Sequence, residues 1–193
     1  MAASTLYYKD FTINIVSKKY DDIDFNSYDK VIEIEKIDPD DPHFCKLIEI
    51  SVNGNGTKKN ALIIASYHTP IDSFVAPHKN GLFLMLNEIL CVFDPETLEI
   101  IDQSEIDPFG TMFEIHQYKD DYILYGECEI YRTSDDLKVK WIFGARDIFV
   151  RCDTDAPAFE MKEDRICLYD FQENYYEIDY DGKLITERIN KSR

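Results

Sequence analysis

The chain has 193 residues and a mass of 22.6 kDa, enough to bury a hydrophobic core without disulfide bonds or metal ions. Hydrophobic residues make up 45% of it, and its 13 tyrosines and 12 phenylalanines exclude a disordered, solvating tail. Its 38 acidic and 21 basic residues give a net charge of -17, which disfavours binding to nucleic acids and to membranes with anionic lipids.

The acidic excess is unevenly distributed along the chain. Residues 1–80 hold 9 basic and 12 acidic residues, whereas residues 81–193 hold 12 basic and 26 acidic ones. The first residues lack the basic leader and apolar stretch of an export signal, and the longest apolar runs are shorter than the roughly 20 residues of a membrane span. Five cysteines without a CxxC pair favour reduced, buried thiols in a cytoplasmic protein.

Polar and apolar residues alternate with a period of two through much of the chain. In the N-terminal segment, residues 11–16 and 30–37 are predicted strands. Residues 46–67 are predicted to form a hairpin, because Asn53-Gly54 and Asn55-Gly56 tolerate positive φ between two apolar runs. The alternation at residues 47–52 predicts strands with one solvent-exposed face, and the chain as a whole is predicted to be all-β.

A pattern of strand, short turn, strand, acidic turn and strand recurs about every 40 residues. Its three copies span residues 80–101, 120–141 and 163–185. The segment Asp94-Pro95-Glu96-Thr97, followed by Leu98, is similar to the Asp-x-x-Thr-Gly turn of quinoprotein-type propeller blades, with Leu98 in place of glycine. Residues 75–190 therefore resemble β-propeller blades of the quinoprotein and WD-type superfamilies, although no Trp-Asp or Gly-His pair is present.

This resemblance implies antiparallel blade-like sheets that cover one another. Three blades, or four with the hairpin region, are too few for an ordinary ring, so we expect a small or incomplete propeller-like array. The alternative is a β-sandwich or another meander. We expect one domain over residues 1–193, in which 1–45 supply cap strands, 46–79 a hairpin or first blade, and 80–190 three blade-like repeats.

No catalytic, metal or cofactor motif stands out in the sequence. His43 and Cys45 are close together, but nothing nearby completes a zinc site. Asp153-Thr154-Asp155 lacks the third acid and the glycine of a calcium loop, so a solvated loop is the preferred interpretation. Cys152, between Arg151 and Asp153, is interpreted as a partly exposed structural thiol.

Tyrosines alternate with acidic residues in the last two repeats, a composition that suits protein interfaces. We predict a non-catalytic, acidic protein-binding module whose partner carries a basic patch, for example an immunity-like protein that sequesters a basic toxin. Eight residues are predicted to bind the partner: Glu127, Glu129, Tyr131, Trp141, Asp170, Glu173, Tyr175 and Glu177. Two alternatives remain open: a carbohydrate-binding protein or glycoside-acting enzyme with acidic residues at a sheet-end pocket, and a homo-oligomer subunit that completes a ring.

Overall fold

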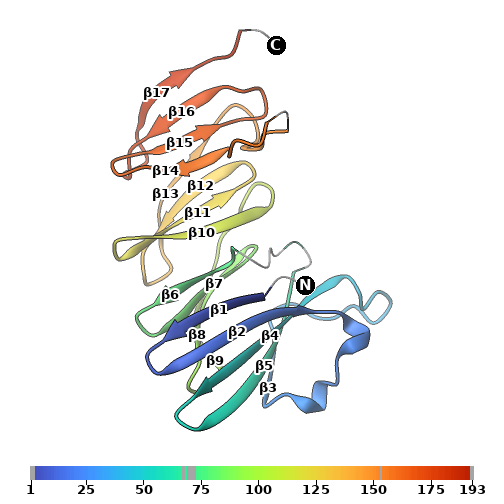
Figure 1. Ribbon diagram of the computed structural model, residues 1–193. Coiled ribbons are helices and arrows are strands. Elements are labelled where there is room, and N and C mark those ends of the chain that lie inside the picture. The colour runs from blue at the N-terminus through green and yellow to red at the C-terminus, as the bar shows by residue number, and fades with distance from the viewer. Residues whose placement is uncertain (1–2, 67, 69–72, 153, 192–193) are drawn as a thin grey trace. The chain divides into compact units, whose positions relative to one another are not determined.

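The computed structural model describes residues 3–66, 68, 73–152 and 154–191, and its regular structure is almost entirely strand. The chain divides into two compact units, Met1–Ile106 and Asp107–Arg193. Each unit contains two β-sheets, here named A and B in the first unit and C and D in the second (Figure 1). The predicted all-β class is confirmed.

Sheet A is built from the first five strands in the order β1-β2-β4-β5-β3. They are β1 (Ala3–Tyr8), β2 (Phe11–Lys18), β3 (Lys30–Glu33), β4 (Cys45–Gly54) and β5 (Thr57–Ser66). The hairpin of β4 and β5 turns at Asn55 and Gly56, both with positive φ, as a two-residue turn between twisted strands requires. The strands of the predicted cap and those of the hairpin therefore belong to one sheet, and Tyr67, the predicted end of the hairpin, lies outside the described residues.

Both faces of sheet A are partly covered, which differs from the predicted single solvent-exposed face. On one face Ile48 and Ile50 belong to a core shared with sheet B. On the other face Leu47 packs with Leu62 and Ile64 under side chains from the segment after β2. That segment contains two short 3-10 helices, η1 (Tyr20–Asp22) and η2 (Phe25–Ser27). No described helix has the length and the apolar composition that crossing a bilayer would demand.

Sheet B is an up-and-down meander of four antiparallel strands. It contains β6 (Val75–His78), β7 (Gly81–Leu86), β8 (Ile89–Asp94) and β9 (Glu99–Glu105). Its side chains Leu84 and Phe93 are completely buried in the core shared with sheet A. Two ion pairs also connect sheet A to the end of sheet B: Lys9 to Glu96 at 2.9 Å, and Lys30 to Glu99 at 3.2 Å.

Sheets C and D repeat the same meander (Figure 1). Sheet C contains β10 (Met112–Tyr118), β11 (Asp121–Gly126), β12 (Glu129–Thr133) and β13 (Val139–Gly144). Sheet D contains β14 (Phe159–Met161), β15 (Ile166–Tyr169), β16 (Tyr175–Ile178) and β17 (Leu184–Arg188). Each predicted repeat thus has a fourth strand at its N-terminal side that the sequence pattern did not reveal. The expected antiparallel blade-like sheets are confirmed.

The three meanders share a distinctive turn between their third and fourth strands. The last residue of the turn has positive φ in each case: Leu98 (60°), Leu137 (59°) and Gly182 (79°). A register shift accompanies the turn in all three strand pairs. The acidic turn predicted at Asp94 is held together by its own side chain, which accepts hydrogen bonds from the Glu96 amide and the Thr97 hydroxyl.

Sheets C and D share a hydrophobic core. The turn that precedes β17 makes a further contact with sheet C. The Trp141 indole of sheet C donates a hydrogen bond to the Tyr180 carbonyl at 3.0 Å. A Cβ placed on Gly182 would lie 2.7 Å from the Trp141 ring, so glycine is required where the ring rests on the turn. Tyr180 also stacks on Tyr118 of β10, with ring centroids 3.7 Å apart.

Candidate functional site

Four of the predicted partner-binding residues lie in sheet C or in the turn that leads into β12. The Glu127 carboxylate accepts a hydrogen bond from the Thr111 amide, and the Glu129 carboxylate accepts one from the Phe109 amide at 3.1 Å. Tyr131 is buried, and its hydroxyl group donates a hydrogen bond to the Glu129 carboxylate. Trp141 is half-buried against sheet D. These side chains therefore support the loop before β10 and the packing of sheets C and D.

Asp170, another predicted binding residue, is completely buried. Its carboxylate accepts hydrogen bonds from the amides of Gln172 and Asn174, from the Asn174 side chain and from the Tyr176 hydroxyl. Burial, with this last hydrogen bond, raises the pKa of Tyr176 to about 12. Asp170 thus holds the turn between β15 and β16 and has no free oxygen surface for a partner.

The remaining three residues, Glu173, Tyr175 and Glu177, are half-buried, and the two glutamates are ion-paired. Glu173 forms a bidentate ion pair with Arg151, whose Nε and Nη2 lie 3.0 Å and 2.5 Å from the two carboxylate oxygens. Glu177 accepts a hydrogen bond from the Tyr175 hydroxyl at 2.7 Å and pairs with Arg165 at 3.2 Å. These contacts lower the pKa of Glu177, with the Tyr175 hydrogen bond as the largest cause. Tyr175 and Glu177 alternate with Tyr176 and Ile178, whose side chains are in the core with sheet C, so they lie on the opposite face of sheet D.

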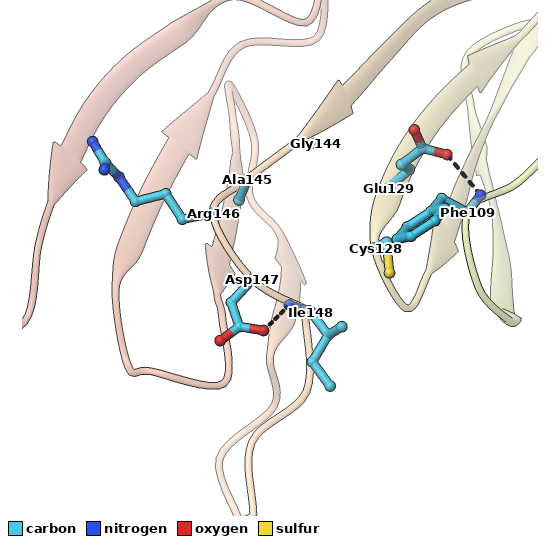
Figure 2. Close-up of a pocket in the computed structure, with 8 residues that line it drawn as sticks. All are labelled: Phe109, Cys128, Glu129, Gly144, Ala145, Arg146, Asp147 and Ile148. Carbon is cyan, nitrogen blue, oxygen red and sulfur yellow. Dashed lines mark hydrogen bonds between the residues drawn. The ribbon is translucent and has the colours of Figure 1, made fainter. Parts of the chain in front are cut away.

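A cleft of about 330 Å³ opens beside Glu129 in the second unit. Figure 2 shows its lining: the loop residue Phe109, Cys128 and Glu129 at the start of β12, and the segment that follows β13. We call it the Phe109 cleft, after a ring that is 78% exposed. Arg146 points away from Phe109 in this view and pairs with Glu187 at 3.0 Å.

The loop that carries Phe109 is held by the two predicted glutamates. The Glu129 carboxylate accepts a hydrogen bond from the Phe109 amide, and the Glu127 carboxylate accepts one from the Thr111 amide at 3.2 Å. Between them Gly110 has φ 95°, and a Cβ there would lie 2.8 Å from the Glu127 carboxylate. The loop therefore has a defined conformation that presents an apolar ring to solvent.

The Phe109 cleft lacks an activated nucleophile. Burial raises the pKa of the Cys128 thiol, and Glu127, Glu129 and Asp147 raise it further, so the thiol is protonated at neutral pH. The two carboxylates that line the cleft are engaged within the protein, since Asp147 accepts the Ile148 amide at 2.8 Å. Among the described residues, no three His, Cys, Asp or Glu side chains gather as a metal site would require.

All five cysteines are free thiols, and two of the four that were expected to be buried, Cys45 and Cys128, are only half-buried. Cys91 and Cys167 are buried, Cys45 and Cys128 are half-buried, and Cys152 is exposed. Burial raises the pKa of Cys91 to about 12. The neighbouring Asp153, part of the segment compared with calcium loops, lies outside the described residues.

A second cleft of about 450 Å³, which we call the aromatic cleft, lies along β10, β11 and β14. Phe113, Tyr125 and Phe159 contribute rings, and Tyr125 stacks on Phe159 with centroids 4.8 Å apart. Glu114 and Asp155 contribute carboxylates. The Glu114 carboxylate is 2.7 Å from the His116 ring.

Phe109 was not among the residues singled out in the sequence. Its signal was its position in Asp-Pro-Phe-Gly, where an aromatic residue stands in a turn composition that usually lies at the surface. The alternation of tyrosines with acids drew attention to strands instead, where tyrosines have a packed face to fill.

No family model matches the chain, and no curated protein is significantly similar to it. Three of the similar solved structures are the CNH domain of AfRom2, BamB from Moraxella catarrhalis and HIRA(644-1017). Their identities to this chain are 8%, 10% and 10%, and their TM-scores are 0.48, 0.47 and 0.44. The matched regions cover 98%, 97% and 98% of this chain. They cover 54%, 52% and 54% of the three similar chains.

This chain thus spans about half the length of the structures it resembles, which include proteins of the propeller type. The resemblance of residues 75–190 to propeller blades is confirmed, because three consecutive four-stranded meanders occupy that range. At these identities the likeness concerns the fold alone.

Proposed function

We propose that this chain is a non-catalytic protein-binding module and that its partner docks at the Phe109 cleft through a basic patch with an apolar centre. The observation that carries this proposal is an aromatic ring, 78% exposed, on a loop held by two carboxylates. Exposed rings that are fixed before binding act as anchors, because little side-chain and loop freedom is lost on association.

The charge of the chain supports a basic partner. A net charge of -17 attracts a cationic surface over long range and accelerates encounter, and Glu129 and Asp147 lie next to the proposed anchor. One version of this function is an immunity-like protein that sequesters a basic toxin. The free thiols suit a reducing compartment, so we place this function in the cytoplasm.

The test is capture of partners from a native lysate by the immobilised protein, quantified at low and high salt. Phe109→Ser is expected to reduce capture of the bound partner at least tenfold, the loss that characterises interface anchors. The matched control is Phe171→Ser, which removes another exposed ring of the same unit. Equal capture by the two variants would contradict docking at the Phe109 cleft.

The acidic component has its own variant. Glu129→Gln with Asp147→Asn is expected to flatten the salt dependence of capture, because screening acts on the charges that steer the partner. Asp102→Asn with Glu105→Gln removes the same charge from exposed positions on β9 and serves as the control. If both pairs change salt dependence equally, net charge alone explains the attraction.

The aromatic cleft favours carbohydrate binding as a second candidate function. Its rings and its two carboxylates are side chains that proteins use to stack on and hydrogen-bond sugars, and its volume of about 450 Å³ suits a small ligand. Titration calorimetry with a panel of oligosaccharides tests this candidate. Binding that is lost in Glu114→Gln and kept in Phe109→Ser would favour it over partner docking.

A further inference from the structure

A pocket in the first unit has a charge opposite to that of the whole chain. It measures about 280 Å³ and lies where β2 ends and β4 begins, two segments that pair through Lys18 and Leu47. Its lining includes three lysines: Lys18, Lys19 and Lys46. His43, Cys45 and Asp21 are among the other lining residues. We call it the lysine pocket. Its composition is unexpected in a protein with 38 acidic residues.

Lys46 is the feature that the fold leaves unexplained. Its side chain is half-buried, yet no described residue forms an ion pair or hydrogen bond with it. Burial alone lowers the pKa of Lys46, and no neighbouring carboxylate opposes that effect. Removing an ammonium group from water without a partner costs free energy, so an anion in the pocket would supply the missing interaction.

The other lining groups provide donors and one competing carboxylate. Lys18 pairs with Glu49 at 3.3 Å. No described residue forms an ion pair or a hydrogen bond with the side chain of Lys19. His43 contacts Tyr20 edge-on with ring centroids 5.7 Å apart, and an imidazole has a ring N–H donor in either tautomer. Asp21 is the one carboxylate that lines the pocket.

The thiol in the pocket is neutral and does not repel an anion. Burial raises the pKa of Cys45, and the charge of Glu35 raises it further. The Cys45 thiol donates to the Pro42 carbonyl at 3.4 Å. With Lys18 paired to Glu49, Lys19 and Lys46 outnumber Asp21, the one carboxylate in the lining, so the lining carries a net positive charge.

We propose that the lysine pocket binds the phosphate group of a small phosphate monoester. A monoester carries a charge of about -1.5 to -2 at neutral pH, and Lys19 and Lys46 provide two ammonium groups without an ion pair to bind it. Its oxygens accept several hydrogen bonds, and the pocket volume accommodates the phosphate with a short organic group. The negative charge of the rest of the chain is screened beyond about 8 Å at physiological salt, so local lysines determine the affinity.

The test is titration calorimetry of the full chain with inorganic phosphate, a sugar phosphate and the same sugar without phosphate. We expect both phosphates to bind and the neutral sugar not to bind; tighter binding of the sugar phosphate would identify an organic monoester as the ligand class. Lys46→Gln should weaken phosphate binding at least tenfold, since hydrogen bonds to charged groups have about that effect. Lys46→Arg keeps the charge and should retain measurable binding.

Lys58→Gln is the matched control, because Lys58 is an exposed lysine of β5 in the same unit and its loss changes net charge equally. Lys19→Gln changes an accessible side chain and provides a second variant whose folding is not at risk. Circular dichroism checks that each variant is folded. Absence of phosphate binding to the wild-type chain, or equal weakening by Lys46→Gln and Lys58→Gln, would overturn the proposal.

Discussion

Asp170 has a different role in the structure from the one that its sequence context predicted. In the sequence it is one acid among many beside tyrosines, and a binding role was predicted for it. In the structure its carboxylate is completely buried and accepts four hydrogen bonds, two of them from backbone amides. A sequence pattern records that an acid is present but not whether the chain folds around it.

Asp170→Ala is expected to lower the free energy of unfolding by about 3 kcal/mol, because it leaves buried donors without an acceptor. Urea denaturation measures the loss. Asp181→Ala is the control: its side chain is 76% exposed, and we expect a change below about 0.5 kcal/mol. Similar losses in both variants would show that Asp170 has no special structural role.

Buried tyrosines predict how stability depends on pH. Burial raises the pKa of Tyr28, Tyr122 and Tyr176 from 10.0 to about 12, with hydrogen bonds to Glu49 and Asp170 adding to the effect for the first and third. A raised pKa in the folded state means that the unfolded chain loses these protons first as pH rises. The free energy of unfolding should therefore be unaffected by these groups below pH 10 and fall between about pH 10 and pH 12.

Urea denaturation across this range measures that decline, and the ultraviolet absorbance of tyrosinate reports the titration. Tyr176→Phe should reduce the alkaline loss of stability, since phenylalanine has no proton to release. A decline of the same size in this variant would contradict the assignment to Tyr176.

At the scale of elements, the turn between the third and fourth strands explains why the repeats differ in sequence. Leu98 and Leu137 adopt positive φ, which disfavours a branched residue, but both side chains are buried. Gly182 occupies the corresponding place in sheet D, where the Trp141 ring leaves no room for a Cβ. The residue at this position is thus selected by what packs on the turn as well as by φ.

Leu98→Gly is expected to destabilise the protein by about 2 kcal/mol. Removal of a buried leucine side chain costs about 2–5 kcal/mol, whereas relief of the left-handed conformation returns about 1 kcal/mol. Gly182→Ala should also be destabilising, because it adds both a clash and strain. Thermal and urea denaturation of the two variants test this; a more stable Leu98→Gly protein would show that backbone strain outweighs packing.

At the scale of the whole molecule, the two compact units raise the question of how cooperatively the chain folds. A single domain over residues 1–193 stays a prediction, while each unit has its own core, around Ile63 in the first and Ile166 in the second. In the sequence the acidic excess was divided at residue 80, but the boundary between the two units lies after Ile106. Residues 81–106, with six acids and no basic residue, belong to the first unit.

Ile63→Ala should distinguish one cooperative domain from two. The side chain is completely buried, and its truncation is expected to cost about 3 kcal/mol. If the units unfold separately, amide hydrogen exchange accelerates in sheets A and B and stays unchanged in sheets C and D. Faster exchange in all four sheets would show a single domain.

The sequence by itself determined the all-β class, the strand alternation and three blade-like repeats, because these follow from local patterns of apolar residues and turn formers. It did not reveal the first strand of each meander: β6 and β14 are short and β6 contains Pro77, whereas β10 has seven residues and its length does not explain why it was missed. Only the tertiary structure decided that Asp170 is buried, that Glu127 and Glu129 hold the Phe109 loop, and that Lys46 lacks a partner. The Phe109 loop is held by contacts between residues 16 and 20 positions apart. The hydrogen bonds of Asp170 are local, but its partner Tyr176 lies in the core formed with sheet C. The alternation of polar and apolar residues does not encode such packing.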